Sequence, residues 1–223
     1  MCIAVFMWET HPLYPFLLFL NRDEYHSRPT KPLGWWEGGE ILGGRDVQAG
    51  GTWLASSRDG RLTFITNFRE LHSRPHTKTR GHLSVRFLQS KKKPIEFAKE
   101  VVKEADQYNG FNLILVDLCS KSMVYLANRP KENGNFVTEV SSGIHVLSHA
   151  NLDSLWLKVR RYGKDELPLK ENFAELMMDT SKDDLSILPG IYSPEFEYHL
   201  SAIYVDITGP QGLHGTKWGD VLL

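Results

Sequence analysis

The chain has 223 residues, and its 26 lysine and arginine residues nearly balance 27 acidic ones. This length suits one globular domain, and the formal net charge of −1 excludes a global field that would draw the protein to nucleic acid or an anionic membrane. No apolar run approaches the ~20 residues of a membrane-spanning helix, so we expect no transmembrane segment.

Targeting signals and a disulfide framework are also missing from the pattern. The first 20 residues have neither the basic n-region nor the small-residue cleavage site of a signal peptide. Only two cysteines occur, Cys2 and Cys119, which does not suit a small secreted disulfide fold. We therefore expect a cytoplasmic protein with reduced thiols.

Apolar, strand-sized runs alternate with turn signals through most of the chain. The strands predicted from them cover residues 3–8, 16–20, 52–56, 62–67, 111–118, 122–127, 136–140, 144–148 and 202–207. The first two are expected to form a hairpin. Residues 27–51 are rich in proline and glycine, which excludes a long helix there. Asp59-Gly60 predicts a second hairpin between the strands on either side.

Helical spacing of apolar residues appears in four segments, at residues 83–88, 94–108, 153–162 and 171–178. The order of strands, helices, strands, helices and a last strand does not alternate as it would in a doubly wound sheet. We therefore expect an α+β protein of two antiparallel sheets with helices packed outside. Residues 1–208 are predicted to form one domain, followed by a loose tail at 209–223.

Cys2 directly follows the initiator methionine. Removal of Met1 before a small residue is expected during translation, and it would leave one residue with both a thiol and an α-amine. The unperturbed pKa of such an amine is ~7.7–8.0 and that of the thiol ~8.5, so the neutral amine can take the thiol proton. N-terminal threonine enzymes use this arrangement. The alternative is that Cys2 is a small buried hydrophobe at the start of a strand.

Polar residues close two of the predicted strands. If residues 16–20 run antiparallel to residues 3–8, Arg22 and Asp23 should lie near Cys2. An arginine there can hold a thiolate or a substrate carboxylate, and an aspartate can orient the α-ammonium. Asn67 ends another strand and can donate to an oxyanion. The alternatives are a solvated turn at residues 21–24 and a strand-end amide that satisfies backbone groups.

Other motifs give weaker signals. His72, His76 and His82 have loosely metal-like spacing, but Pro75 breaks any helical frame and no cysteine accompanies them, so a solvated basic loop is favoured. The glycine-rich residues 34–44 lack the lysine and the spacing of a phosphate-binding P-loop. We therefore expect neither a metal site nor a resident cofactor.

Six motifs occur in order along the chain: MCI at the start, NRDEYHSRP at 21–29, GGRD at 43–46, GGTWL at 50–54, TNFRE at 66–70 and YNGFNLI at 108–114. Together they resemble those of the NRDE family, also called the Transport and Golgi organisation protein 2 family. NRDEYHSRP and the tryptophan pair are especially similar to plant-type members.

This resemblance implies an N-terminal-nucleophile hydrolase-like fold, a four-layer αββα sandwich of two antiparallel sheets. The nearest analogy is the group that contains bile-salt hydrolase, penicillin V acylase and acid ceramidase, which begin with Met-Cys and cleave amides. By motif, Cys2 falls on the nucleophile, and Arg22 and Asp23 fall on the arginine and aspartate beside it. Asn67 falls on an oxyanion donor.

The chain departs from the family in two places. Family members usually read Ser-Asn-Ala where this chain has Ser148-His149-Ala150, so His149 replaces an expected oxyanion or amine contact. A neutral imidazole can still donate one hydrogen bond. The family also has Tyr-Gly-Thr-Arg-Ser before its last strand, and we expect residues 198–201 in that place, without the arginine.

Three hypotheses follow. The first is a cysteine amidohydrolase acting on a non-peptide C–N bond of a small or lipid-derived metabolite, with Cys2, Arg22, Asp23, Asn67 and His149 in its site. The second is a non-enzymatic carrier of haem or a lipid-derived ligand, and the third is a Golgi-organisation or trafficking factor. The resemblance also implies links to the Golgi, to mitochondria and to intracellular haem movement. The residues indicate no particular protein partner.

Overall fold

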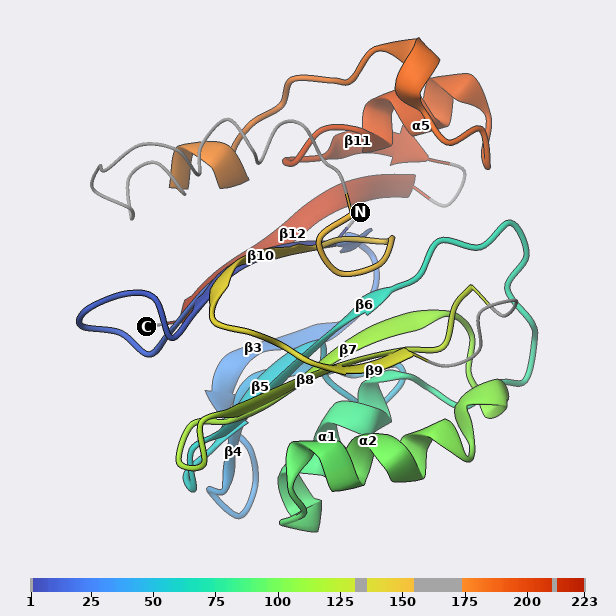
Figure 1. Cartoon of the computed structure of the whole chain (residues 1–223). Coiled ribbons are helices and arrows are strands. Elements are labelled where there is room, and N and C mark those ends of the chain that lie inside the picture. Colours follow the sequence, from blue (N-terminus) through green and yellow to red (C-terminus); the bar gives the residue numbers. More distant parts are fainter. Residues whose placement is uncertain (1, 131–135, 155–173, 210–211, 223) are drawn as a thin grey trace. The chain divides into compact units, whose positions relative to one another are not determined.

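The computed structural model describes residues 2–130, 136–154, 174–209 and 212–222. It divides into two compact units, one made of Met1–Ser27 with Ser142–Leu223 and the other of Arg28–Ser141 (Figure 1). Each unit contains one antiparallel sheet. The expected α+β class with two antiparallel sheets is therefore confirmed, while the stacking into a four-layer sandwich and the single domain stay predictions.

Unit 1, the unit that contains both ends of the chain, has a five-stranded sheet in the order β10-β1-β2-β12-β11. The helical elements in its described part are α5, the short 3-10 turn η3 and a turn of helix at residues 174–177. The bounds are β1 Ile3–Trp8, β2 Phe16–Tyr25, β10 Gly143–Leu147, η3 Leu185–Ile187, α5 Pro194–Leu200, β11 Asp206–Gly209 and β12 Gly212–Leu222.

The β1–β2 hairpin sets the position of the N-terminus. The two strands pair antiparallel, with Trp8 opposite Phe16 at the turn and Ile3 opposite Asn21 at the far end. Because a one-residue slip would turn every apolar side chain to the other face, these two continuous apolar runs fix the register. The predicted hairpin is confirmed, and it brings residue 21 and its neighbours to the start of the chain.

One face of the unit 1 sheet packs against the segments that follow β10. Alternate residues of β1 and β2 point to this face and meet apolar side chains from residues 176–177 and 203. Burial of each such side chain contributes about 1.5–3 kcal/mol. The cluster consists of Ile3, Val5, Met7, Leu17, Phe19, Leu176, Met177 and Ile203.

Unit 2 has a seven-stranded sheet in the order β3-β4-β5-β6-β7-β8-β9, so neighbours in the sheet are neighbours in sequence. Two helices cover one of its faces (Figure 1). The bounds are β3 Thr30–Trp35, β4 Ile41–Asp46, β5 Leu54–Ser57, β6 Arg61–Asn67, α1 Gly81–Ser90, α2 Pro94–Val102, η1 Ala105–Gln107, β7 Phe111–Asp117, β8 Ser122–Ala127 and β9 Phe136–Glu139.

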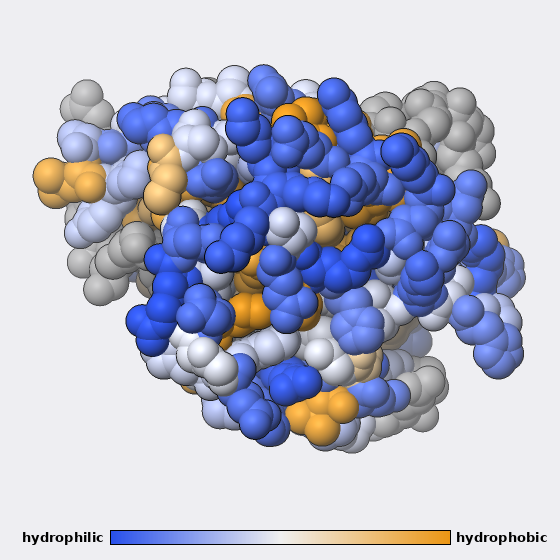
Figure 2. Space-filling model, turned by 90° about the horizontal axis from the view of Figure 1, so that it is seen from below, coloured by the Kyte–Doolittle hydropathy of each residue, from blue (hydrophilic) through white to orange (hydrophobic). Residues whose placement is uncertain are grey.

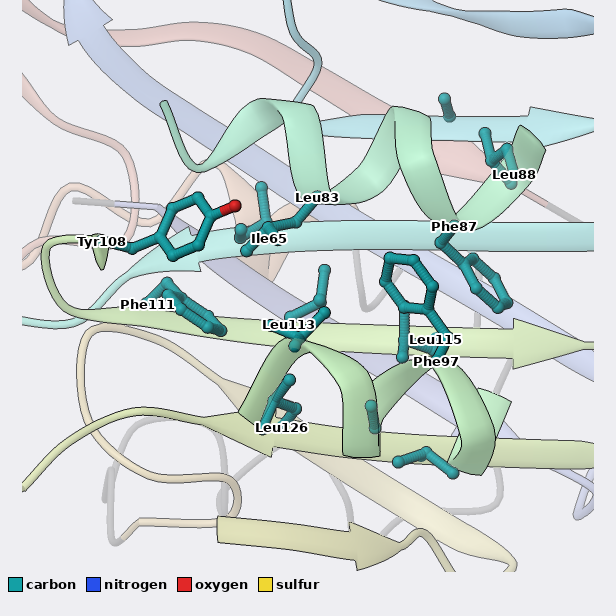
Figure 3. Close-up of a cluster of buried hydrophobic side chains, with 14 of the residues drawn as sticks. Ile65, Leu83, Phe87, Leu88, Phe97, Tyr108, Phe111, Leu113, Leu115 and Leu126 are labelled. Carbon is teal, nitrogen blue, oxygen red and sulfur yellow. The ribbon is translucent and has the colours of Figure 1, made fainter. Parts of the chain in front are cut away.

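The unit 2 core lies between this sheet and the two helices, and Figure 3 shows it in close-up. Leu83 and Phe87 of α1 are one helical turn apart, so they face the sheet together. Phe97 of α2 packs against Phe87 with ring centroids 5.4 Å apart. Leu113 and Leu115 of β7 complete the cluster from the sheet side.

The structure differs from the predictions in the linker at residues 27–51 and near the end of the chain. Residues 27–51 form β3 and β4 despite their prolines and glycines. The expected loose tail is wrong, because residues 212–222 form β12 and pair along β2. The last predicted strand, 202–207, overlaps β11 only at residues 206 and 207, because β11 runs from Asp206 to Gly209. Most of the predicted helix 153–162 lies outside the described residues.

Candidate active site

Cys2 lies just before β1, between β2 and the segment that follows β10. Its main-chain nitrogen donates a hydrogen bond to Nε2 of His149 at 3.1 Å. Its thiol donates to the main-chain oxygen of Asp23 at 3.8 Å. The predicted proximity of Cys2 to Asp23 and His149 is thus present within unit 1.

The environment of Cys2 keeps its thiol protonated. Burial raises the pKa of the Cys2 thiol, and the carboxylate of Asp23 acts in the same direction. The positive charge of the amino terminus, the hydrogen bond to the main chain of Asp23 and the nearby Arg22 guanidinium lower the pKa of this thiol without overcoming the effect of burial. A thiol with a raised pKa reacts slowly unless a base removes its proton, so chemistry at Cys2 requires a neighbouring base.

His149 is held beside Cys2 by a closed turn after β10. The carboxylate of Asp153 contacts His145 Nδ1 at 2.8 Å and accepts a hydrogen bond from the main-chain N–H of Val146 at 3.0 Å. The main-chain N–H of Asp153 donates back to Val146. The pKa of Asp153 is lowered: burial opposes the shift, but these hydrogen bonds outweigh it. These contacts of Asp153 could not be predicted from the sequence, because they join a strand to a turn whose shape the sequence does not indicate.

The motif Asn21-Arg22-Asp23-Glu24 belongs to β2 itself and is not a solvated turn. Asn21, Arg22 and Asp23 are only 2%, 5% and 8% exposed. Since side chains alternate along a strand, Asn21 and Asp23 point to one face and Arg22 and Glu24 to the other. Asn21 donates to the main-chain oxygens of Met177 and Ile203, which ties the strand to its covering segments.

Arg22 and Asp23 therefore have different partners on the two faces of the strand. Arg22 Nη2 lies 3.9 Å from a carboxylate oxygen of Glu24 on the same face. Asp23 instead accepts a hydrogen bond of 2.7 Å from the Thr216 hydroxyl on β12. That hydroxyl also accepts from the Val205 N–H at 3.0 Å, so its own proton is directed to Asp23. Thr216 therefore fixes the carboxylate next to Cys2.

Strand β12 places two further residues beside the motif, although residues 209–223 were expected to form a loose tail. His214 lies opposite Tyr25, with ring centroids 4.9 Å apart, and Thr216 lies opposite Asp23. Burial lowers the pKa of His214, although the carboxylates of Asp23 and Glu24 act in the opposite direction.

The end of the chain differs from the expected order. Residues 198–201 lie in α5 and at its end, whereas the last strand is β12. On β12, the Nζ of Lys217 donates to the main-chain oxygen of His26 at 3.1 Å. The correspondence of residues 198–201 to the family pattern stays a prediction.

Asn67 belongs to unit 2, at the end of β6 opposite Phe111. The loop after it is anchored by Glu70, which accepts hydrogen bonds from the Gly110 N–H and from Arg129. The bond between Glu70 and Gly110 links the motif TNFRE to the motif YNGFNLI. The role of Asn67 as an oxyanion donor to chemistry at Cys2 stays a prediction.

Two further features bear on the hypotheses. Among the described residues, no group of three or more histidine, cysteine, aspartate or glutamate side chains is arranged to hold a metal ion. Within the same residues, no helix combines the length and the hydropathy needed to cross a membrane.

Comparison with known protein families matches residues 1–223 to the family described as Transport and Golgi organisation 2. The chain belongs to this family. Its mouse homolog is 35% identical over 170 residues, which is 71% of this chain and 60% of the mouse protein. The human homolog gives the same identity and coverage, and the bovine one is 31% identical over 89% of this chain and 78% of its own length.

The chain thus spans less than two thirds of the length of the mouse and human proteins. Among solved structures, it is similar to a Caenorhabditis elegans N-acylethanolamine-hydrolyzing acid amidase ortholog. The TM-score is 0.42 at 11% identity, covering 78% of this chain and 85% of the other. The family resemblance read from the six motifs is confirmed.

Proposed function

We propose that this family member is an amidohydrolase whose nucleophile is Cys2, exposed as the first residue by removal of Met1. Its substrate is a non-peptide amide of a small or lipid-derived acid. The observation that carries the proposal is the 3.1 Å hydrogen bond between the Cys2 nitrogen and His149 Nε2. After removal of Met1, that nitrogen becomes the α-amine, already positioned on a neutral acceptor.

The hydrogen bond to His149 gives the amine a defined orientation. Nε2 of His149 accepts, so the neutral ring carries its proton on Nδ1. One amine N–H is then directed to His149, and the nitrogen lone pair is available to the thiol on the same residue. Burial raises the pKa of that thiol and so disfavours the thiolate. The α-amine acts as an internal base that removes the thiol proton when the thiol attacks.

The reaction then proceeds in two acyl-transfer steps. The amine takes the thiol proton, Sγ forms a bond to the amide carbonyl carbon, and the carbonyl electrons move to oxygen. When the C–N bond breaks, the leaving nitrogen takes the proton from the ammonium and departs as an amine. Water, deprotonated by the same α-amine, attacks the thioester, and cleavage of the C–S bond releases the acid and restores the thiol.

The remaining residues position the nucleophile and stabilise charge in the reaction. The Asp23 carboxylate, held by Thr216, places a negative charge next to the thiol and the amine. Arg22, paired with Glu24, supplies a buried positive charge that favours the thiolate. Asn67 is proposed to donate to the oxyanion, an interaction worth ~3–4 kcal/mol in comparable sites.

The test is hydrolysis of a panel of N-acyl amides by the untagged protein, by Cys2→Ala and by Cys119→Ala as the matched thiol control. We expect turnover with Cys119→Ala and none with Cys2→Ala. Mass spectrometry of quenched reactions should show an acyl group on the Cys2 peptide. Equal rates for the wild type and Cys2→Ala, or an acyl group on Cys119 alone, would reject the proposal.

A further inference from the structure

A second polar site lies in unit 2, where the basic loop before α1 meets η1. A cavity of about 600 Å³ opens there, and the proposed hydrolysis does not use it. Its lining combines two cationic side chains, two hydroxyl groups, an imidazole and one carboxylate: Lys78, Arg86, Thr79, Tyr108, His82 and Glu104.

The walls of this cavity are fixed in place. The main-chain N–H of Lys78 donates to Gln107 at 2.9 Å, and Arg74 donates to the main-chain oxygen of Tyr108 at 2.6 Å. Asn109 accepts from the Arg74 N–H and donates to its main-chain oxygen, which closes the loop on itself. The cations are therefore presented by a structured segment that needs no reordering to bind a ligand.

Glu104 organises the two cations without using up their donors. It contacts Lys78 Nζ at 2.8 Å and also accepts from Arg86 Nη1. Lys78 and Arg86 carry three and five N–H donors respectively, so most of them stay available. The side chains of Lys78 and Arg86 are 53% and 42% exposed, whereas that of Glu104 is only 18% exposed.

Tyr108 forms the floor of the cavity. Its side chain is 1% exposed, and its hydroxyl accepts a hydrogen bond of 3.1 Å from Arg86. In Figure 3 its ring lies beside Phe111 and its hydroxyl oxygen points towards α1. The hydroxyl hydrogen is therefore directed away from Arg86 and can serve as a further donor.

The surrounding segment is strongly basic in a chain that is otherwise slightly acidic. Residues 71–108 contain nine lysine and arginine residues against four acidic ones, while the whole chain has a net charge of −1. α1 and α2 lie at the bottom of Figure 1, and the face seen from that side is mainly hydrophilic (Figure 2). Such a concentration of positive charge raises the local concentration of anions.

We propose that this cavity binds a phosphate group, held by Lys78, Arg86 and the hydroxyls of Thr79 and Tyr108. A tetrahedral anion matches the donor set, because it offers several acceptor oxygens to donors that converge from three elements. The phosphate belongs either to a soluble phosphomonoester or to the headgroup of a lipid. This site is independent of Cys2 and stands whether or not the protein is a hydrolase.

The experiment is a calorimetric titration of the full chain with inorganic phosphate at low ionic strength. A parallel measurement follows sedimentation with phosphatidylcholine vesicles that contain or lack phosphatidic acid. Lys78→Gln with Arg86→Gln is the test variant. Lys99→Gln with Lys103→Gln is the matched control, because both residues are exposed, belong to the same basic segment and do not line the cavity. Lys78→Gln alone leaves Arg86 to neutralise Glu104 and guards against loss of folding.

We expect phosphate or phosphatidic acid vesicles to bind the wild type, and the test variant to weaken that binding about tenfold or more, as loss of a charge-assisted hydrogen bond does. The control variant should change it little. Binding of vesicles without binding of free phosphate assigns the group to a lipid headgroup. If neither phosphate nor the vesicles bind, the proposal is overturned. An equal loss of binding in both double variants also overturns it, because it shows that only diffuse charge attracts the anion.

Discussion

The main-chain nitrogen of Cys2 donates to Nε2 of His149 across 147 positions of sequence. Two features of unit 1 produce this contact. The β1–β2 hairpin sets the position of Cys2, and β10 pairs with β1 on the other side, with Leu147 opposite Ala4. His149 lies two residues after the end of β10, so the sheet register brings it to Cys2.

Replacement of His149 tests the positioning of the amine. His149→Ala removes the acceptor at Nε2, and we expect the rate of amide hydrolysis to fall about tenfold, the worth of one oriented hydrogen bond. His149→Asn restores the usual family residue and an acceptor, so it should recover much of the rate. An unchanged rate in His149→Ala, with an unchanged unfolding midpoint, would show that this contact has no part in the reaction.

The pH dependence of Cys2 alkylation separates processed from unprocessed protein. With Met1 retained, burial raises the thiol pKa above its ordinary value, so the alkylation rate should rise only in strongly alkaline solution. With Met1 removed, the neutral amine takes the proton and alkylation should begin at lower pH. Because the folded-state pKa is raised, the thiol's contribution to stability is present below the unfolded-state value and is lost as the pH rises through the folded one. Identical profiles for the two forms would contradict the internal base.

Thr216 is expected to act through Asp23. Thr216→Val keeps the shape but removes the 2.7 Å hydrogen bond to the carboxylate, so unfolding should cost about 1–2 kcal/mol less. The less neutralised carboxylate should also shift the alkylation profile of Cys2 to higher pH, because Asp23 raises the thiol pKa. Thr216→Ser keeps the hydroxyl and should restore the profile. If Thr216→Val lowers stability but leaves that profile unchanged, Thr216 is a structural residue only.

The β1–β2 hairpin could be predicted from the sequence because both strands are continuous apolar runs. Such runs specify buried strands, and antiparallel pairing then places Arg22 and Asp23 near Cys2 whatever the rest of the fold. The structure adds that β2 continues to Tyr25, so the motif is part of a buried strand. β12 supports that extension, because it pairs with β2 from Leu18 to Tyr25.

The positions of Thr216 and Asp153 in the candidate site could not be predicted from the sequence. β12 contains glycines, histidine and lysine in no alternating pattern, and only pairing with a buried neighbour makes it a strand. β3 and β4 were missed for the same reason, since proline and glycine outweighed the pairing that the sheet supplies. Local propensity fails where long-range pairing decides the structure.

Glu70 tests the anchor between the two family motifs of unit 2. Glu70→Ala leaves Arg129, whose side chain is 7% exposed, without its 2.6 Å partner, and the free energy of unfolding should fall by about 3 kcal/mol. Glu100→Ala is the matched control, because its pair with Lys92 is exposed on both sides and should contribute less than about 1 kcal/mol. Chemical denaturation measures both. Similar small losses would mean that the anchor does not hold the loop after Asn67.

The central claim, that Cys2 is an N-terminal nucleophile, is tested most directly by peptide mass spectrometry. The protein is expressed without a tag from its complete natural coding sequence and treated briefly with a mild thiol alkylator. We predict that Met1 is absent, that the α-amine of Cys2 is free and that Cys2 is labelled well before Cys119. A retained Met1, or an acetylated Cys2 amine, would contradict the claim, because the amine would then be unable to accept the thiol proton.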